Sequence, residues 1–596
     1  MSSLSVAASA VDIPVDDSMV IGGSILPGWV QGQEAPLRAS AVIIEADTTL
    51  CIISSDVLGV SRDIADAVAD RIAADLGIPF ENTLITATHT HHAPTTFTVH
   101  GYEREEGFCD GLADAMVEAA RAAMAQLRDQ NLSPNSREAE FGFAVGNEAT
   151  WGANSRVLLK DGTVGWYGFS HDEIVRPTGP FDPDLPVIAF LRPDDSIAAT
   201  LFNHSTHNIG ATGPGRSPAV YGLTAQAAER RHSGNALFLP GAFGSSHNMG
   251  LPAEEGIIRL SAALDDALAT VDPGLRGPVA ALKKPFRYEI RHFDEAAEDA
   301  AVRQWCERWY DAQTVETYAE VFRKMRAQLE PMQGTPCDTW LQVIRLGEVA
   351  IVGIPGEMFA SLGLAIKRRS PFRHTVVVGL ANDEVGYIPD SAGYAFGGYQ
   401  LWTGLHSVLP QGTGERMVDA VVQMLEELHG TPQLAPSADS GRPGIRPVRE
   451  GDAAELQSFY NGLSPASRRL FRPLGWNASF ADAKGAVDGA VAGERYDIVM
   501  EDRGKIVGWA FLMGMNKEFA HLGIGIADAY CSQGLGRDLM ANLTEAGRSR
   551  GLKGVDLIVV QQNDRARKLY ERYGFVVNGT QQGPDGLEYY SMRLEY

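Results

Sequence analysis

A stretch rich in Pro, Gly and Ser near residue 440 divides this chain into two unequal parts. The segment 431–444, TPQLAPSADSGRPG, follows the helical pattern MVDAVVQMLEELHG and has no apolar periodicity of its own. A chain of 596 residues is also too long for a single hydrophobic core. We therefore predict a domain of residues 1–430, a linker of residues 431–444 and a second domain of residues 445–596.

The two parts differ in the order of their predicted elements. In residues 1–430, strand-like runs such as SAVIIEA, LCIISSDV and TLITATH alternate with amphipathic helices, which predicts a large α/β domain. In residues 445–596, helix-rich sequence precedes the strand pair YDIVMED and KIVGWAFLMG, and the strand HLGIGIAD leads into a glycine-rich turn and a helix. This second order predicts a smaller α+β domain whose sheet opens beside a helix N-terminus, where an anionic cofactor binds well.

Charge and composition narrow the classes of partner. A net charge of −24 opposes binding to nucleic acid and to anionic membrane surfaces, so we expect a small-molecule substrate. The N-terminus has no basic segment before an apolar run, and no apolar stretch is long enough to span a bilayer, which predicts a cytoplasmic protein. Five cysteines without CxxC pairs predict reduced thiols, so a metal would be held by His, carboxylate or Tyr.

Two predicted strands end in histidines. LITATHTHHAP contains His89 and His91, which fall on the same side of an extended chain, and AATLFNHSTHN contains His204 and His207. Strand ends are where α/β proteins place their sites, so these residues indicate a metal or catalytic site. Any one of them could instead be a loop histidine whose ring nitrogens are hydrogen-bonded to backbone groups.

Residues 6 to about 427 resemble the neutral ceramidase family, whose motifs they show in the family's order. TATHTHHAP and IPGEMF are the most specific, and AASAVDIPV, FNHSTHN, VIRLGEVAIVGIPGEMF and GLANDEVGYIPDSAGYAFGGYQ accompany them. The resemblance implies a zinc-dependent hydrolase with an α/β fold. The implied zinc ligands are His89, His204, Glu357 and Tyr387, and the implied catalytic residues are His91, Arg156 and Tyr399.

The implied ligands suit hydrolysis of an acyl bond. Two neutral nitrogens, a carboxylate and a phenol leave a position for a water whose pKa Zn²⁺ can lower toward about 7. Tyr399, His91 and Arg156 could then donate to the oxyanion and help protonate the leaving amine. Structural roles are the alternative, because Glu357 could cap a helix beginning near Met358 and Arg156 could form a surface ion pair.

The chain also departs from that family. His92 replaces a small residue after the HTH motif, and the GDVSPN-like segment survives only loosely at 243–248. From the sequence we also expect neither the family's secretion signal nor its C-terminal immunoglobulin-like domain. A membrane sphingolipid is therefore a poor candidate, and we expect a soluble N-acyl compound as the substrate.

Residues 445–596 resemble the GNAT acetyltransferase family. The resemblance rests on IRPVREGDAAEL, KIVGWAFL, YCSQGLGRDLM and QNDRARKLYERYGF, again in the family's order. It implies that acetyl-CoA is the cofactor and that Tyr570 protonates the departing thiolate. The implied cofactor-binding residues are Gln533, Gly534, Leu535, Gly536 and Arg537, which hold the pyrophosphate through their amides, and Asn563.

Several features of this second domain leave alternatives open. A glycine pair between a strand and a helix can be a tight turn without a ligand, and Tyr570 can be a core aromatic. Cys531 stands where the family usually has Arg or Gln, which weakens the expectation of cofactor affinity. The transfer needs a base, and His521 and Asp528 lie on or near the right strand without either being singled out.

Taken together, the sequence predicts a bifunctional enzyme. One domain would hydrolyse an amide in a small molecule with Zn²⁺, and the other would acetylate an amine with acetyl-CoA. These opposed reactions suggest protection and deprotection of an amine in a biosynthetic or self-resistance pathway. Two alternatives stay open: the zinc site could cleave an ester or lactone, or one domain could have lost its chemistry and only sense CoA or substrate.

Overall fold

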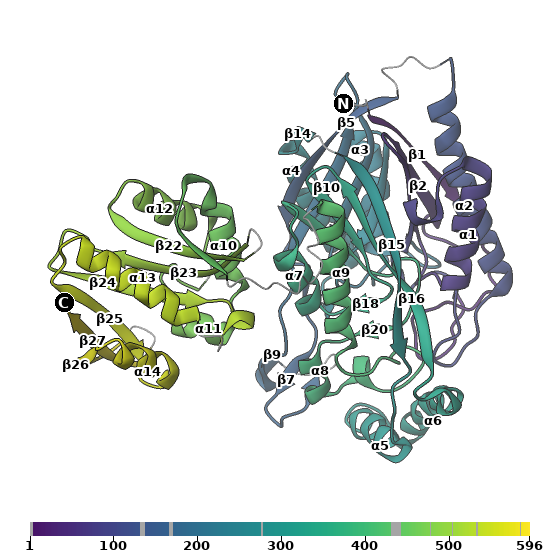
Figure 1. The fold of residues 1–596 in the computed structure, drawn as a ribbon. Coiled ribbons are helices and arrows are strands. Elements are labelled where there is room, and N and C mark those ends of the chain that lie inside the picture. The colour runs from purple at the N-terminus through teal and green to yellow at the C-terminus, as the bar shows by residue number, and fades with distance from the viewer. Residues whose placement is uncertain are drawn as a thin grey trace. The chain divides into compact units, whose positions relative to one another are not determined.

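The computed structural model describes residues 4–131, 137–165, 171–248, 250–275, 278–430, 443–476, 478–502, 505–531, 535–583 and 586–596. Contacts divide the chain into two compact units, Met1–Gln433 and Leu434–Tyr596. Each unit mixes helices and strands, so the predicted fold class, a large α/β unit followed by a smaller α+β unit, is confirmed (Figure 1). Most of the predicted linker, residues 431–442, lies outside the described residues.

The first unit contains one large sheet. Its strands run in the order β12 (Asn235–Pro240), β11 (Ile197–His204), β10 (Asp184–Leu191), β5 (Glu138–Asn147), β1 (Leu4–Asp12), β2 (Arg38–Glu45), β3 (Thr49–Ser55) and β4 (Thr83–Ala87), and β14 (Asp272–Leu275) also pairs with β5. Pairs β3–β4 and β11–β12 are parallel, and the other pairs are antiparallel. β4 is an edge strand and β11 is next to the opposite edge strand, β12, so each of the two strands that lead to the histidines belongs to a parallel pair.

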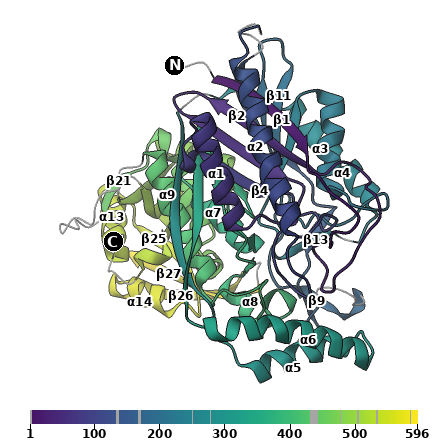
Figure 2. The same cartoon turned by 90° about the vertical axis from the view of Figure 1, so that its right-hand side faces the viewer.

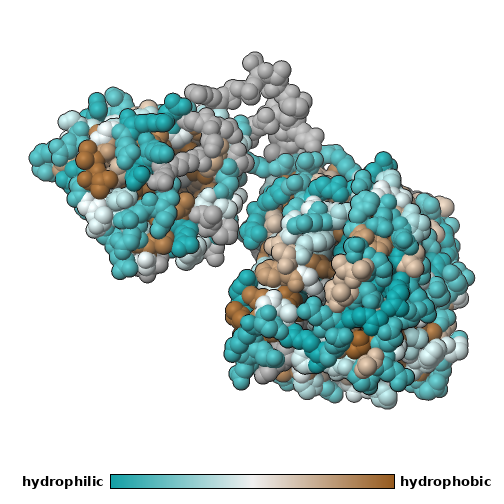
Figure 3. Space-filling view, turned by 90° about the horizontal axis from the view of Figure 1, so that it is seen from below, coloured by the Kyte–Doolittle hydropathy of each residue, from teal (hydrophilic) through white to brown (hydrophobic). Residues whose placement is uncertain are grey.

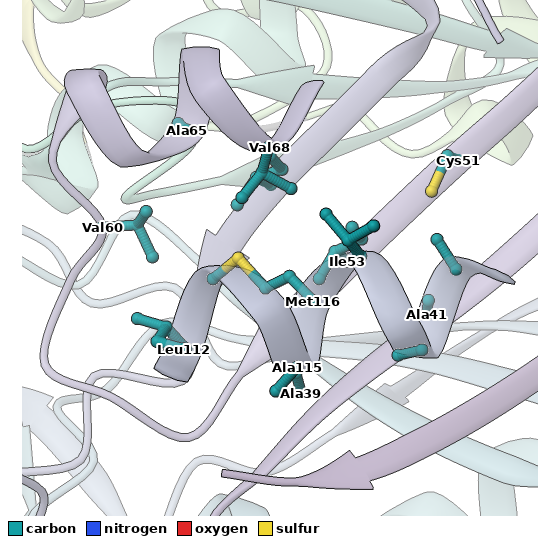
Figure 4. Packing of buried hydrophobic residues seen from close by; sticks show 14 of the residues in the cluster. Ala39, Ala41, Cys51, Ile53, Val60, Ala65, Val68, Leu112, Ala115 and Met116 are labelled. Carbon is teal, nitrogen blue, oxygen red and sulfur yellow. The ribbon is translucent and has the colours of Figure 1, made fainter. Parts of the chain in front are cut away.

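Alternation along β2 and β3 produces the layers of this unit. Ala41 and Ile53 face α1 (Arg62–Leu76) and α2 (Glu106–Arg128) in one apolar cluster (Figures 2 and 4). Val42 and Ile52 face the opposite side, where they pack with residues of a second sheet such as Ile351. Because successive strand residues point to opposite faces, strands covered on both sides are continuously apolar, as the runs SAVIIEA and LCIISSDV predicted.

The second sheet runs in the order β15 (Val279–Glu289), β16 (Pro336–Leu346), β17 (Val349–Gly353) and β19 (His374–Val378). Its outer face packs against α7 (Ala360–Arg369) and α9 (Thr413–His429), through residues such as Val343, Val352 and Met417. Helices α5 (Glu295–Cys306) and α6 (Ala312–Leu329) are inserted between the long strands β15 and β16 (Figure 1). Helices α3 (Ala219–His232) and α4 (Ala253–Ala269) cover β10 and β12 of the first sheet.

Short elements connect the large ones and position the site. β6 (Gly152–Asn154) pairs with β13 (Ser246–Asn248), and β18 (Glu357–Met358) pairs in parallel with β20 (Tyr387–Ile388). β7 (Val157–Leu159) lies between β8 (Val164–Gly165) and β9 (Ile174–Pro177). α8 (Ser391–Phe396) and a 3₁₀ turn at Tyr399–Leu401 follow β20.

The second unit has a single sheet with helices on both faces. Its strands run in the order β21 (Gly444–Pro447), β22 (Arg495–Asp502), β23 (Lys505–Met513), β24 (Phe519–Ile526), β25 (Gly554–Val560), β27 (Glu588–Glu595) and β26 (Val576–Gln582). Helices α10 (Ala453–Gly462) and α12 (Phe480–Val491) pack on one face, and α13 (Leu535–Ser549) and α14 (Asp564–Arg572) on the other. The predicted hairpin of YDIVMED and KIVGWAFLMG is formed by β22 and β23.

The surface that Figure 3 presents is largely hydrophilic on both units, with apolar residues scattered over it. Scattered apolar residues of this kind are ordinary on folded domains. Within the described ranges, no helix combines the length and the apolar character needed to cross a bilayer.

Candidate metal centre and acyl-CoA site

Three histidine rings converge near the strand ends of the first unit. His89 and His91 follow β4, and His207 lies three residues after the end of β11. His91 Nε2 is 3.2 Å from His89 Nε2, and the ring centroid of His207 is 5.0 Å from that of His89. One nitrogen from each ring lies within 4.8 Å of the others, which is close enough for the three to share one metal ion.

Backbone carbonyls determine which nitrogen of each ring faces this centre. The contacts are His89 Nδ1 to Leu58 O (2.7 Å), His207 Nδ1 to Ser246 O (2.7 Å) and His91 Nδ1 to Gly23 O (3.2 Å). A proton on Nδ1 satisfies each carbonyl and leaves Nε2 unprotonated and directed inward, which is the usual arrangement of a metal-bound imidazole. Burial lowers the pKa of His207 to about 4 and that of His89 well below its usual value, so both rings are neutral near pH 7.

The β18–β20 pair brings a carboxylate and a phenol to the same centre, because Glu357 and Tyr387 are partners in its register. Glu357 Oε2 lies 3.1 Å from His207 Nε2 and 3.8 Å from His89 Nε2, and the Tyr387 hydroxyl lies 3.4 Å from His207 Nε2. Ligands of a tetrahedral Zn²⁺ with bonds of about 2.0 Å stand about 3.3 Å apart. The observed spacings are therefore those of a set that fits such an ion.

One alternative left open by the sequence was that Glu357 caps a helix, and the structure shows that it does not. It lies in β18, and α7 begins at Ala360 with Phe359 at its N-cap position and no side-chain cap. Burial raises the pKa of Glu357, and burial together with the Glu357 charge raises the pKa of Tyr387 well above 10. A cation at the centre would offset the cost of keeping this buried carboxylate ionised.

His204, one of the four predicted ligands, does not join the centre. Its Nδ1 lies 2.6 Å from the Tyr221 hydroxyl and its Nε2 lies 2.9 Å from Glu148 O, so both nitrogens are engaged elsewhere. His204 is the last residue of β11 and its ring lies near Tyr221 of α3, whereas His207 follows a bend after the strand and its ring faces His89 and Glu357. In the structure, His207 rather than His204 is the histidine of the FNHSTHN motif that faces the centre.

Tyr399 and Arg156 lie beside the centre. The ring of Tyr399 is 5.9 Å from that of Tyr387, and its hydroxyl is 3.0 Å from His100 Nε2. Arg156 is not a surface residue, because it is 1% exposed and donates to Gln400 Oε1 (2.7 Å) and to a backbone carbonyl (2.6 Å). Burial lowers the pKa of Arg156 to about 10, which leaves its charge intact at neutral pH.

Sequence reasoning overlooked three further residues around the centre. His100 contacts Tyr399, and the His247 ring stacks on that of His207 with centroids 4.0 Å apart. Glu384 accepts from Gly386 N at 2.9 Å, and burial raises the pKa of its carboxyl well above the usual value. His247 belongs to the altered 243–248 segment, so that departure from the ceramidase pattern was the signal that could have indicated it.

In the second unit, the two central strands diverge. β24 and β25 pair in parallel only where residues 519–521 face residues 554–556, the first three residues of each strand. The helices α13 and α14 follow the C-terminal ends of these strands, which is the end at which the pairing has stopped. Strands that part in this way expose backbone groups to a ligand and present helix N-termini to an anion.

Most of the predicted cofactor-binding residues lie at these helix starts. Leu535, Gly536 and Arg537 form the first turn of α13, while Gln533 and Gly534 lie outside the described residues. Asn563 caps α14 and accepts from Ala566 N at 3.2 Å. Tyr570 lies on α14, and burial raises its pKa to about 12, so it remains a protonated phenol.

The two candidate bases differ in their surroundings. The Asp528 carboxylate accepts from Ser464 N (2.8 Å), Ser464 Oγ (2.9 Å) and Ser467 Oγ (2.5 Å). Burial opposes ionisation of Asp528, but these hydrogen bonds lower its pKa overall, so it serves to hold the start of α11 (Pro465–Leu470). His521 is half-buried on β24, and burial lowers its pKa.

Comparison with known proteins agrees with both resemblances. Residues 458–575 match the model of the Acetyltransferase (GNAT) family. Among solved structures, the chain is similar to the neutral ceramidase from Pseudomonas aeruginosa, with a TM-score of 0.57 and 17% identity, covering 74% of this chain and 77% of that chain. It is also similar to a ceramidase complexed with C2, with a TM-score of 0.56, 16% identity and the same coverage. No curated protein matches the chain.

At 17% identity the ceramidase likeness concerns the fold. The chain therefore joins a unit with the fold of a neutral ceramidase to a C-terminal unit that matches the GNAT acetyltransferase family, as the sequence motifs predicted.

Proposed function

We propose that the first unit is a zinc-dependent hydrolase that cleaves an acyl bond in a small molecule. The observation on which this rests is the convergence of His89 Nε2, His207 Nε2 and the Glu357 carboxylate, with Tyr387 adjacent. Neutral imidazoles, each with its other nitrogen hydrogen-bonded to a carbonyl, together with one carboxylate are ligands that suit Zn²⁺. We assign the ligands as His89, His207, Glu357 and Tyr387.

The side chains around this set suit hydrolysis. When bound there, Zn²⁺ would lower the pKa of a water toward about 7 and polarise the acyl carbonyl. The His91 Nε2 faces the same centre and would accept a proton from the attacking water. Tyr399, oriented by His100, and the Arg156 cation lie on the Tyr387 side, where they would stabilise the oxyanion and assist the leaving amine.

The second unit, in this proposal, transfers an acetyl group from acetyl-CoA to an amine. The GNAT family match, the divergence of β24 from β25 and the protonated Tyr570 support this assignment. Tyr570 would give its proton to the departing CoA thiolate, as the family resemblance implies. The net charge of −24 favours small-molecule substrates over nucleic acid or an anionic membrane surface for both reactions.

Metal analysis combined with chelation tests the proposal. The full-length protein, purified without chelator, should contain about one zinc ion per chain. Prolonged chelation should remove that zinc and abolish hydrolysis of an N-acyl substrate, while acetyl transfer measured in the same preparation continues, because the GNAT chemistry uses no metal. Adding Zn²⁺ back should restore hydrolysis.

Two outcomes decide between this proposal and its alternatives. Absence of any bound transition metal from freshly purified, folded protein would exclude the assigned centre. Matched amide and ester substrates with the same acyl group should be assayed together, since a zinc centre polarises either carbonyl. Hydrolysis of the ester alone would change the assignment from an amidase to an esterase.

A further inference from the structure

A segment of the second unit lies over the diverging end of β24, on the face opposite the cofactor helices. A Cβ added to Gly525 would meet the Phe471 ring at 2.4 Å, so Phe471 lies directly on this strand. Its ring neighbours Trp509 and Phe511, which pack with α10 and α12. Because α13 and α14 cover the other face, a thioester held between the strands would be approached by its acceptor from the Phe471 side.

The segment is fixed at both ends. Asp528, just beyond β24, holds Ser464 and Ser467 at the start of α11. Arg468 donates to Trp476 O at 3.0 Å, which closes the loop after the helix. The residues between these anchors are therefore held at the end of β24 where the pairing with β25 has stopped.

Arg472 extends from this segment toward the other side of the diverging strands. Its Nη2 lies 3.4 Å from the Tyr589 hydroxyl, and Tyr589 is the register partner of Val560 at the end of β25. The guanidinium carbon lies 4.8 Å from the centroid of the Trp476 ring. Arg472 is half-buried, whereas Trp476 is 55% exposed, so an aromatic surface beside the cation faces solvent.

The only charged residues of the segment 464–481 are arginines. Residues 464–481 contain Arg468, Arg469 and Arg472 and no Asp or Glu, although the chain as a whole has a net charge of −24. A planar guanidinium keeps its charge and matches the two oxygens of a carboxylate. An exposed indole next to it offers contact to an apolar or aromatic group.

From this placement we propose that the acceptor amine carries a carboxylate and an apolar or aromatic side chain, as an α-amino acid does. Arg472 binds the carboxylate, Trp476 contacts the side chain, and the amine is directed to the gap between β24 and β25. This inference rests on the proposed acetyl transfer and specifies its substrate class.

Matched acceptors test it in the full-length protein. Release of CoA thiol from acetyl-CoA is measured with L-phenylalanine and with L-phenylalaninamide, which has the same side chain and a neutral amide in place of the carboxylate. The wild type should favour the acid. Arg472→Gln should raise KM for the acid roughly 10- to 100-fold, which is the effect of losing a charge-assisted pair. The KM for the amide should change little in this variant. The KM of Arg472→Lys for the acid should lie between those of the wild type and Arg472→Gln, because lysine keeps the charge without the planar guanidinium.

Arg469→Gln is the control, since it removes an exposed arginine of the helix that precedes Arg472 and should preserve the preference. Unfolding curves of all variants establish that the comparison concerns folded protein. Equal use of acid and amide by the wild type, acetylation of neither, or an equal loss for both in Arg472→Gln would overturn the inference. Failure to bind acetyl-CoA in calorimetry would refute the proposed transfer itself, so the two failures are distinguishable.

Discussion

His204 and His207 occur in one short motif, FNHSTHN, yet their imidazoles face different parts of the first unit. His204 has both nitrogens hydrogen-bonded, to Tyr221 and to the Glu148 carbonyl, and is fully buried. His207 has one nitrogen on Ser246 O and the other directed at Glu357. At the residue scale, the two histidines should therefore differ in what their loss affects.

Paired substitutions test that difference. His207→Ala should reduce the zinc content of the folded protein to near zero and abolish hydrolysis, because a ligand is lost. His204→Ala should keep its zinc but unfold at a lower temperature, because two buried partners lose a hydrogen bond at a cost of about 1–3 kcal/mol each. Metal content per folded chain and thermal unfolding measure the two effects.

The reverse result, zinc lost from His204→Ala and retained by His207→Ala, would restore the ligand set implied by the sequence motifs. His100 shows the same limit of residue-level reasoning. It has no motif of its own, and the contact of its Nε2 with the Tyr399 hydroxyl relates it to the site.

At the scale of elements, the centre depends on the short parallel pair of β18 and β20. That pair places Glu357 beside Tyr387, and the turn around Gly244 packs against the backbone of β18. Gly244 N donates to Met358 O at 2.9 Å, and a Cβ on Gly244 would lie 2.1 Å from Glu357 O. Since the contacted atoms belong to the backbone, they cannot move aside as a flexible side chain would.

We expect Gly244→Ala to displace Glu357 and weaken the centre. The substitution should lower the free energy of unfolding by about 1–3 kcal/mol, the usual effect of overpacking, and reduce zinc affinity measured by competition with a chelator. Gly28→Ala is the control, because a Cβ there has no neighbour within 4 Å. Wild-type stability and zinc affinity in Gly244→Ala would show that this turn does not position Glu357.

At the scale of the whole molecule, one chain holds two units for which we propose opposed amide chemistries. Linkage raises the effective concentration of an intermediate that both sites use, although it does not by itself establish channelling. If one metabolite visits both sites, the amine released by the first unit is the acceptor of the second.

An N-acyl amino acid supplied with acetyl-CoA should therefore be converted by the wild type to its N-acetyl product. Tyr570→Phe should let free amine accumulate, because the thiolate loses its proton donor while the metal centre is unchanged. His89→Ala should stop the reaction before any amine appears, and a mixture of the two variants should restore the product. Chromatography that separates the N-acyl substrate, the free amine and the N-acetyl product follows each step. If unrelated amines are acetylated but the amine released by the first unit never is, the chain holds two independent enzymes.

Much of the architecture was determined by local sequence. Strands covered on both faces must be continuously apolar, so the runs of β2 and β3 were recognisable, and the motifs around His89 and Tyr570 identified both resemblances. The tertiary structure decided which histidine of FNHSTHN faces the centre, because the direction of a side chain in a turn depends on the hydrogen bonds it finds, here Tyr221 for His204 and Ser246 O for His207. It also decided the neighbours of Arg472, since Tyr589 is more than a hundred residues away in sequence and is brought close only by the pairing of β25 with β27.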